Sequence, residues 1–528
     1  MEDSALEPLF VFIAYSVSTI QRSFNALPGS AVIVRYVKSS HQNDPFRTIL
    51  EAILVIFAIR TLLQSRTRSD TTGRHFIKFT ANEIDELVDE WSPEPLVPSL
   101  NEAELADLAS VPVTVGPPGP KPKLQSTGKT AINLASYNFA GLSGNDKVKD
   151  RAVSVLRNYG LGSCGPPGFY GTNDIHLDLE RDIANFLGTE AAIIYSQGFS
   201  TISSVIPAFS KRGDIVIADR GASRSLRSTV RWYDHNDLNS LEEVMQSVAK
   251  EIKTKRWRLT RRFIVTEGIF ENDGAMSDLP KLVELGRKYK YRLILDESFS
   301  FGTVGRTGRG LTELYNVPAN QIDLIVGSLA NTLAGCGGFC AGSRIAVNHQ
   351  RINGTSFVFS AAMPGMLAMA ASEGIQILTS TPSILSNLHT NIFTLRSILD
   401  KIDCITIPSH PASAIIHIQL RDPIEPAGNG LPTTARAVSR RPSNPTSLVP
   451  RDLVVFDIGA EEKLLQEVVD EALAQGILIT RARRLRGQEA LEPRPSIKIA
   501  ASAAVSKKDT EKAASILKGI LTKVLGKK

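Results

Sequence analysis

Short apolar runs alternate with helical patterns through the middle of the chain. The runs that indicate buried strands lie at 191–195, 215–218, 263–265, 293–295 and 324–326. Strands that alternate with helices are typical of a parallel sheet with crossover helices. We therefore expect an α/β lobe over residues 129–375, with the carboxyl ends of its strands at one edge of the sheet.

The pattern changes after residue 375. Strands at 413–419 and 476–480 and a final helix at about 508–525 predict a smaller α+β lobe over 376–528. Residues 421–452 interrupt this lobe with six prolines and almost no apolar periodicity. Such a composition favours a disordered surface insert.

The amino-terminal part is organised differently again. Residues 1–47 form an extension, and 48–64 is apolar apart from Glu51, Arg60 and its polar ends. A helix of this length reaches about 26 Å, close to the thickness of a bilayer core. The segment therefore predicts a transmembrane helix, with an amphipathic or buried helix as the alternative. An acidic helix at 82–90 and a proline-rich connector fill 65–128.

Composition narrows the class of protein. The chain has 528 residues, more than one ordinary core requires, and its 42% hydrophobic content is that of a folded protein. The net charge of +6 permits contact with an anionic membrane face or CoA phosphates. A basic stripe with interleaved aromatics is missing, which argues against nucleic acid.

Cysteine spacing gives no framework of disulfides or metal ligands. The four cysteines are Cys164, Cys336, Cys340 and Cys404. They show no paired spacing, which suits a reducing compartment, and no metal site is expected.

Residues that could take part in a cofactor site follow two of the predicted strands. The run at 293–295 ends in Asp296 and Glu297, and residues 327–338 read GSLANTLAGCGG. Together with 264–274, these segments resemble the α-oxoamine synthase family in order and spacing. These pyridoxal-phosphate enzymes condense an amino acid with an acyl-CoA. The resemblance implies a pyridoxal-phosphate-dependent transferase fold of type I, with a large mostly parallel lobe and a smaller α+β lobe.

Further segments make the resemblance specific. They are residues 91–98, 137–139, 163–172, 176–180 and 235–237. The similarity runs from about residue 46 to the carboxyl terminus, apart from the insert. The sequence Cys164-Gly165-Pro166 is similar to that of the lysine-lacking long-chain-base subunits of serine palmitoyltransferase.

The chain departs from the catalytic members of this family at three positions. Asn331 stands where they carry the lysine that forms an imine with the cofactor, and an amide is neither nucleophilic nor basic. Gly221 and Phe299 stand where they carry the ring-stacking histidine and an active-site histidine. Asp296 retains the acid that bonds the pyridinium nitrogen. The resemblance thus implies a degenerate cofactor site of Gly221, Asp296, Ser298, Phe299 and Asn331, with no catalytic residue in this chain.

The resemblance also implies how such a chain acts. Active sites in this family lie at a dimer interface, and each subunit lends loops to its partner. The residues expected to face the partner are Cys164, Gly165, Phe169, Tyr170, Thr332, Gly337 and Gly338. Glycines let the backbone approach a ligand closely, and prolines hold the shape of the loop.

The expected function is a non-catalytic but required subunit of a heterodimer. The lysine-bearing second subunit would hold pyridoxal 5'-phosphate covalently and condense L-serine with palmitoyl-CoA to 3-ketosphinganine. The expected location is the endoplasmic reticulum membrane, with the lobes in the cytosol, where acyl-CoA and cofactor are found. Small regulatory membrane proteins are further partners compatible with this reading.

Two alternatives remain open from the sequence. One is a regulatory membrane scaffold with no part in an active site. The other is a self-sufficient synthase with a displaced lysine, for which Lys129, Lys211 and Lys288 are the candidates by default.

Overall fold

The structure of the chain is a computed structural model. It describes residues 18–19, 22, 25–26, 28–63, 80–93, 95–97, 99–100, 102–117, 119–222, 230–255, 260–424, 435–439, 453–483 and 490–526. The chain divides into two compact units, residues 1–108 and 109–528, which are described separately.

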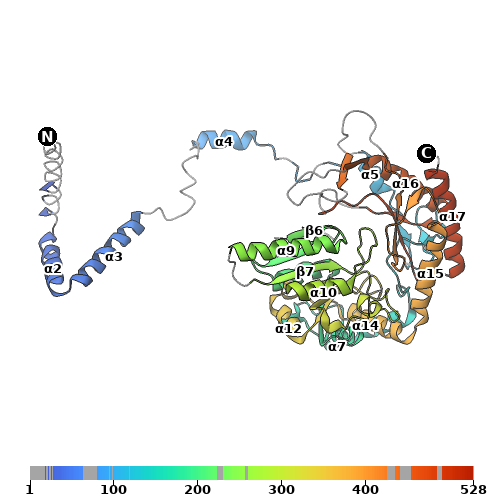
Figure 1. The fold of residues 1–528 in the computed structure, drawn as a ribbon, viewed down its shortest axis with the longest axis horizontal. Helices are drawn as coiled ribbons and strands as arrows, with labels where there is room; N and C mark the ends of the chain where they lie inside the picture. The colour runs from blue at the N-terminus through green and yellow to red at the C-terminus, as the bar shows by residue number, and fades with distance from the viewer. Residues whose placement is uncertain are drawn as a thin grey trace. The chain divides into compact units, whose positions relative to one another are not determined.

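The first unit is helical (Figure 1). Helices α2 (Ser30–Asn43) and α3 (Pro45–Leu63) are joined by a hydrogen bond from the Tyr36 hydroxyl to the Glu51 carboxylate at 3.2 Å. Helix α4 (Ala81–Glu90) follows, and α5 (Glu102–Ala109) leads into the second unit. Thr80 and Glu83 form a complete capping box at the start of α4, so its beginning is fixed locally.

The transmembrane prediction for 48–64 is corrected by this unit. Residues 48–63 of this segment are helical as expected, but they belong to α3, which begins at Pro45, and residue 64 lies outside the described residues. Within the described ranges, no helix combines the length and the apolar character needed to cross a bilayer. The longer helix takes in Arg47 in addition to Glu51 and Arg60, so three charged residues interrupt its apolar residues.

The second unit contains a seven-stranded sheet in the order β4-β10-β9-β8-β7-β5-β6. Its strands are β4 (Ala191–Tyr195), β5 (Ile215–Asp219), β6 (Val230–Tyr233), β7 (Arg262–Glu267), β8 (Arg292–Asp296), β9 (Leu324–Ser328) and β10 (Gly338–Gly342). All five strands predicted for this lobe are confirmed. Strand β10 is antiparallel to both of its neighbours, so the sheet is mixed rather than purely parallel.

Alternate strand residues pack on opposite faces of this sheet, as the period of a strand requires. Ile264 and Leu293 lie in one apolar cluster, whereas Val265 and Ile294 lie in another. The helices that contribute to the first cluster are α6 (Asp146–Tyr159), α7 (Asp174–Leu187), α9 (Leu238–Lys255), α10 (Leu279–Tyr289) and α14 (Gly365–Ser380). Those on the opposite face are α8 (Gly198–Phe209), α12 (Arg344–Asn353) and α13 (Thr355–Val358). Both faces are thus buried, which explains the continuous apolar runs in the sequence.

The smaller lobe surrounds a four-stranded antiparallel sheet. Its strands are β11 (Ile405–Thr406), β12 (Ile415–Leu420), β16 (Thr480–Arg481) and β17 (Ile497–Ala500), and its helices are α15 (Ser383–Leu399), α16 (Ile458–Ala474) and α17 (Lys507–Leu525). The strand and helix predictions for this lobe agree with these bounds within a few residues.

The lobe boundary differs from the predicted one at both ends. Residues 132–133 form β3, which pairs in parallel with β15 (Ile477–Leu478), and Phe139 is buried in the core of the small lobe. Helix α14 continues to Ser380, past the expected boundary at 375. The amino-terminal strand of the large segment therefore belongs to the small lobe, because its apolar side chains complete that core.

Shorter elements lie between the longer helices and strands. They are β1 (Thr114–Val115), β2 (Lys123–Leu124), a π-helical turn η2 (Pro167–Gly171), α11 (Leu311–Leu314) and a 3-10 turn η3 (Ala319–Gln321). Within the predicted insert, β13 (Ala435–Ser439) pairs antiparallel with β14 (Leu453–Asp457). The remainder of that insert, residues 425–434 and 440–452, lies outside the described residues, and so does most of the extension before residue 28.

Candidate functional site

Asp296 is the last residue of β8, at the carboxyl edge of the sheet. Its Oδ1 accepts a hydrogen bond from the Ser298 amide at 2.9 Å. Burial raises the pKa of the Asp296 carboxyl above its usual value, and the charge of Glu271 acts in the same direction. The acid predicted to face a cofactor ring nitrogen is therefore at the expected edge, on the central strands.

Asn331 lies in the turn between β9 and β10. Its side-chain Nδ2 donates to the Ser298 carbonyl at 2.9 Å, and its backbone carbonyl accepts from the Phe139 amide at 3.2 Å. The side chain therefore ties this turn to the strand end that carries Asp296. Asn331 and Ser298 lie together as predicted, and the hydrogen bond between them links the β9–β10 turn to the residues after β8.

Phe299 packs into an aromatic cluster between the lobes. Its ring makes an edge contact with Tyr137 at a centroid distance of 5.2 Å. The Tyr137 hydroxyl lies 2.6 Å from Lys498 Nζ and 3.2 Å from Glu271 Oε1. Lys498 also lies over the Tyr137 ring at 4.8 Å from its centroid. The sequence did not point to Lys498, since it sits in an ordinary-looking strand pattern.

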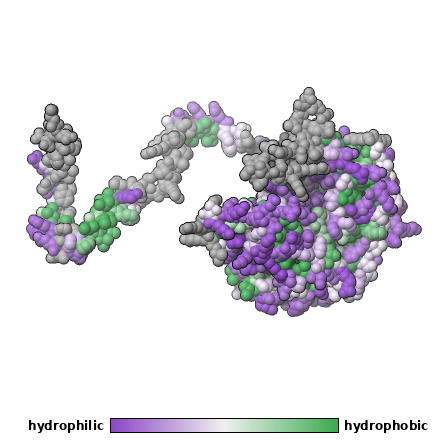
Figure 2. Space-filling model, viewed as in Figure 1, coloured by the Kyte–Doolittle hydropathy of each residue, from purple (hydrophilic) through white to green (hydrophobic). Residues whose placement is uncertain are grey.

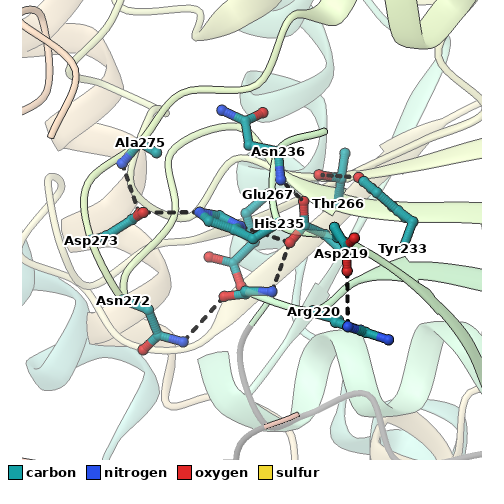
Figure 3. A network of polar contacts seen from close by, with 12 residues as sticks. Asp219, Arg220, Tyr233, His235, Asn236, Thr266, Glu267, Asn272, Asp273 and Ala275 are labelled. Atoms are coloured by element: carbon teal, nitrogen blue, oxygen red, sulfur yellow. Dashed lines mark hydrogen bonds and ion pairs between the residues drawn. The ribbon is translucent and has the colours of Figure 1, made fainter. Parts of the chain in front are cut away.

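Gly221 lies beside Asp219 and His235. These two residues belong to a network of charged groups, which Figure 3 shows. The imidazole of His235 contacts Asp219 Oδ1 through Nδ1 at 2.7 Å and Asp273 Oδ2 through Nε2 at 2.9 Å. A Cβ on Gly221 would lie 2.2 Å from His235 Nδ1. The space that a side chain at 221 would enter is therefore filled by the His235 ring, so a histidine at 221 would require His235 to move.

The charged groups of this network shift the pKa values of one another. Burial alone would lower the pKa of His235, but the two carboxylates outweigh that effect and raise it to about 10. The same imidazolium lowers the pKa of Asp273, against the effect of burial. Asp219 is fully buried and also accepts the backbone amides of Gly221 and Asn236. The network thus fixes the backbone after β5, and its only sequence signal was the His235-Asn236-Asp237 motif.

The predicted partner-facing loop, Gly162–Thr172, is closed by its own backbone. The amides of Phe169 and Gly171 both donate to the Pro166 carbonyl, at 2.9 and 3.0 Å. A Cβ on Gly171 would lie 2.1 Å from the Gly165 carbonyl oxygen, so this closure requires glycine at 171. Cys164 and Tyr170 have φ values of +54° and +66°, which non-glycine residues adopt at a cost of about 1–2 kcal/mol each.

The loop directs its aromatic residues outward. The side chains of Phe169 and Tyr170 are 65% and 101% exposed, and Cys164 is exposed as well. Phe199 and Phe359 are also highly exposed in this unit. A strained loop that presents aromatics to solvent is typical of a surface that another protein covers.

Thr332, Gly337 and Gly338 are placed differently from that loop. Thr332 is 1% exposed, and its hydroxyl donates to the Phe301 carbonyl at 3.0 Å within its own chain. Gly337 and Gly338 are buried where β9 turns into β10, and the Gly337 carbonyl accepts the Leu329 amide. The Thr332 side chain thus belongs to the interior, and contact with a partner through this turn stays a prediction.

The side chains at the carboxyl edge do not fit a covalently held pyridoxal phosphate. Asn331 cannot form an imine, and its amide is held by Ser298. Lys129, Lys211 and Lys288 are all exposed. Lys211 and Lys288 precede β5 and β8, at the opposite edge from Asp296, and Lys288 pairs with Glu242 at 2.6 Å. None of the three is therefore positioned as a displaced lysine.

The part of the chain that the structure describes contains no evident metal-binding site. No group of three or more histidine, cysteine or carboxylate side chains is arranged there to hold an ion.

Comparisons with known proteins identify the family and the fold of the chain. The family model for aminotransferases of class I and II matches residues 129–517. The chain is 36% identical to serine palmitoyltransferase 1 of Saccharomyces cerevisiae over 97% of this chain and 96% of that protein. It is 36% identical to serine palmitoyltransferase 1 of Dictyostelium discoideum over 93% and 96%. The solved serine palmitoyltransferase of Sphingomonas wittichii shares the fold, with a TM-score of 0.66 and 20% identity over 85% of this chain and 99% of that one.

Proposed function

The chain belongs to the class I and II aminotransferase family and, within it, to the serine palmitoyltransferase 1 group, and from this premise we propose that it is a required subunit without its own catalytic centre. In the proposed heterodimer, a lysine-bearing subunit holds pyridoxal phosphate and condenses L-serine with palmitoyl-CoA. The products are 3-ketosphinganine, carbon dioxide and CoA, the first step of sphingolipid synthesis. The observation that carries the proposal is Asn331 at the lysine position, bonded to the Ser298 carbonyl.

Pyridoxal phosphate, when bound by the partner, supplies an electron sink for the serine Cα. This chain contributes a loop that forms part of the wall of that site. The loop Gly162–Thr172 offers a rigid backbone and the exposed residues Cys164, Phe169 and Tyr170. Against a neighbouring active site, such a loop restricts how serine and the acyl chain lie and excludes water, which are positioning effects.

We further propose that the complex lies at the endoplasmic reticulum membrane with its lobes in the cytosol, where acyl-CoA is available. Apolar residues of α3 are exposed in the first unit and form an apolar surface along this helix (Figure 2). Examples are Ile49, Ile53, Leu54, Ile56 and Phe57, which are 55–66% exposed. Burial of this surface against lipid or another membrane protein would remove apolar area from water.

The decisive experiment compares the purified chain with the co-expressed heterodimer. We expect the isolated chain to lack the visible absorbance of bound pyridoxal phosphate and to release no CoA from palmitoyl-CoA and serine. The heterodimer should show both. Cofactor absorbance and turnover in the isolated chain would instead identify a self-sufficient synthase.

A further inference from the structure

The partner-facing loop is attached to the lobe through a segment that precedes α14. The Ala362 amide donates to the Gly165 carbonyl at 2.9 Å, near the start of the loop. Beyond its end, His176 Nε2 lies 2.6 Å from the Met363 carbonyl. Two consecutive residues of one segment therefore contact both ends of the loop region.

The hydrogen-bond partners of His176 define its tautomer. The Asn173 amide can only donate, so Nδ1, at 2.9 Å, accepts and carries no proton. Nε2 then carries the proton and donates to the Met363 carbonyl. The residue is 4% exposed, so solvent does not compete for either bond. His176 thus caps the start of α7 through Nδ1 and binds the segment that precedes α14 through Nε2.

Met363 extends this connection to the turn that contains Asn331. A Cβ on Gly337 would lie 2.5 Å from Met363 Cε, so the side chain fills the space above that glycine. Ser360 in the same segment contacts Ser196, at the end of β4, through hydroxyls 3.1 Å apart. A shift of the 360–363 segment would therefore move both the partner-facing loop and its seat on the sheet.

We propose that His176 is a positioning residue for the condensation, because its Nε2–H bond to Met363 holds the partner-facing loop in its working geometry. This inference rests on the proposed function, since the reaction takes place on the partner subunit. His176 itself touches no substrate. Its role is to keep Cys164, Phe169 and Tyr170 in register with the neighbouring site, where an error of about 1 Å can cost on the order of 100-fold in rate.

Two substitutions in the co-expressed heterodimer separate the two bonds of the ring. In His176→Asn, the amide oxygen replaces Nδ1 and can still accept from Asn173, but the side chain is too short to reach Met363. In His176→Gln, the amide nitrogen can take the place of Nε2 and donate to the Met363 carbonyl. We expect kcat to fall roughly 10- to 100-fold in the Asn variant and to recover to within a few-fold of wild type in the Gln variant.

His349→Asn is the matched control. His349 makes the same kind of contacts, with Nε2 2.8 Å from the Ala208 carbonyl and Nδ1 facing the Asn353 side chain at 3.3 Å. It lies on α12, outside the proposed machinery, and its loss should leave kcat unchanged. Heterodimer yield and thermal unfolding, measured on all three variants, report whether any loss of turnover is a loss of fold.

The outcomes separate the inference from the proposed function. Full turnover in His176→Asn, or recovery by Asn rather than Gln, would overturn the positioning role and leave only helix capping. If His176→Asn fails to assemble, the Gln variant decides: near-normal turnover supports the inference, and lost turnover with normal assembly overturns it. A second loop variant, Cys164→Trp, adds a bulky indole to the loop itself. Loss of turnover in Cys164→Trp with normal turnover in His176→Asn would overturn the inference and leave the proposed function standing. Normal turnover in both would also remove the loop from the partner's site, and with it that part of the proposed function.

Discussion

The carboxyl edge of the sheet and the partner-facing loop differ in whether their side chains find partners within this chain. At the edge, Asn331 bonds Ser298, Phe299 packs on Tyr137, and His235 lies between two carboxylates. In the loop, Cys164 and Tyr170 hold strained backbone angles and remain exposed. The edge is arranged for stability within one chain, whereas the loop holds a strained backbone around exposed side chains, which supports its proposed contact with a second chain.

The largest effect should come from breaking the charged network at the edge. His235→Ala removes the imidazolium between Asp219 and Asp273 and leaves the buried Asp219 carboxylate without that counter-charge. Removal of one member of a buried ion pair costs about 3–5 kcal/mol. Chemical denaturation should show this loss in the free energy of unfolding. A loss below 1 kcal/mol would mean that the network contributes little, and the contrast with the loop would weaken.

A smaller effect, on rate rather than on stability, is expected for Cys164→Trp. The indole adds bulk where the loop approaches the neighbouring site, while most of the interface is unchanged. We expect assembly with the partner but turnover lower by on the order of 100-fold, about 2.7 kcal/mol. Discrimination between serine and alanine should loosen, because the serine hydroxyl is less well placed.

Kinetics with both amino acids on the co-purified complex test this. Cys404→Trp is a useful comparison, because Cys404 lies in the small lobe and bonds the Leu521 carbonyl. Normal turnover and serine preference in Cys164→Trp would favour a scaffold without a part in the active site.

The pH dependence of unfolding should also reveal the network. The pKa of His235 is raised from 6.5 to about 10 in the folded chain. Its contribution is fully present below about pH 6.5 and is lost as the pH rises through about 10, because only the folded state holds the proton in that window. One such proton changes stability by at most about 1.4 kcal/mol per pH unit.

Urea unfolding of wild type and His235→Gln across that range provides the measurement. The wild-type free energy should fall more steeply with rising pH than that of the variant. Parallel curves would show that His235 is not protonated in the folded chain.

On the loop, truncation of an exposed aromatic should weaken association without affecting the fold. Tyr170→Ala removes a fully exposed side chain, so the unfolding temperature of this chain should stay within measurement error. If the loop meets the partner, association should weaken by about 1–2 kcal/mol. Titration of the partner into the variant, with Tyr159→Ala as a control outside the loop, distinguishes these results. Unchanged affinity would place Tyr170 outside the interface.

The smallest effect is expected for Asn331→Lys in the isolated chain. Gly221 and Phe299 still lack the imidazoles that the family resemblance implies at these positions, and the nearby His235 ring is held by Asp219 and Asp273. Neither a cofactor absorbance nor CoA release should appear. A bound cofactor with turnover in this single variant would show that the carboxyl edge is still nearly able to catalyse the reaction and is not arranged for stability alone.

The sequence by itself determined five of the seven strands of the large sheet, but not β6 and β10, together with the final helix and the chemical character of Asn331 and Asp296. Apolar periodicity and residue type are local properties, so they can be read without coordinates. The loss of an imine-forming lysine at residue 331 is such a property.

Tertiary structure decided what surrounds these residues. His235 meets acids 16 and 38 positions away in the chain, and His176 meets a carbonyl 187 positions away. The inward orientation of Thr332 and the place of residues 132–139 in the small lobe also depend on distant partners. The partners of buried polar groups depend on which distant segments the fold brings together, and the periodicity of the sequence does not predict these contacts.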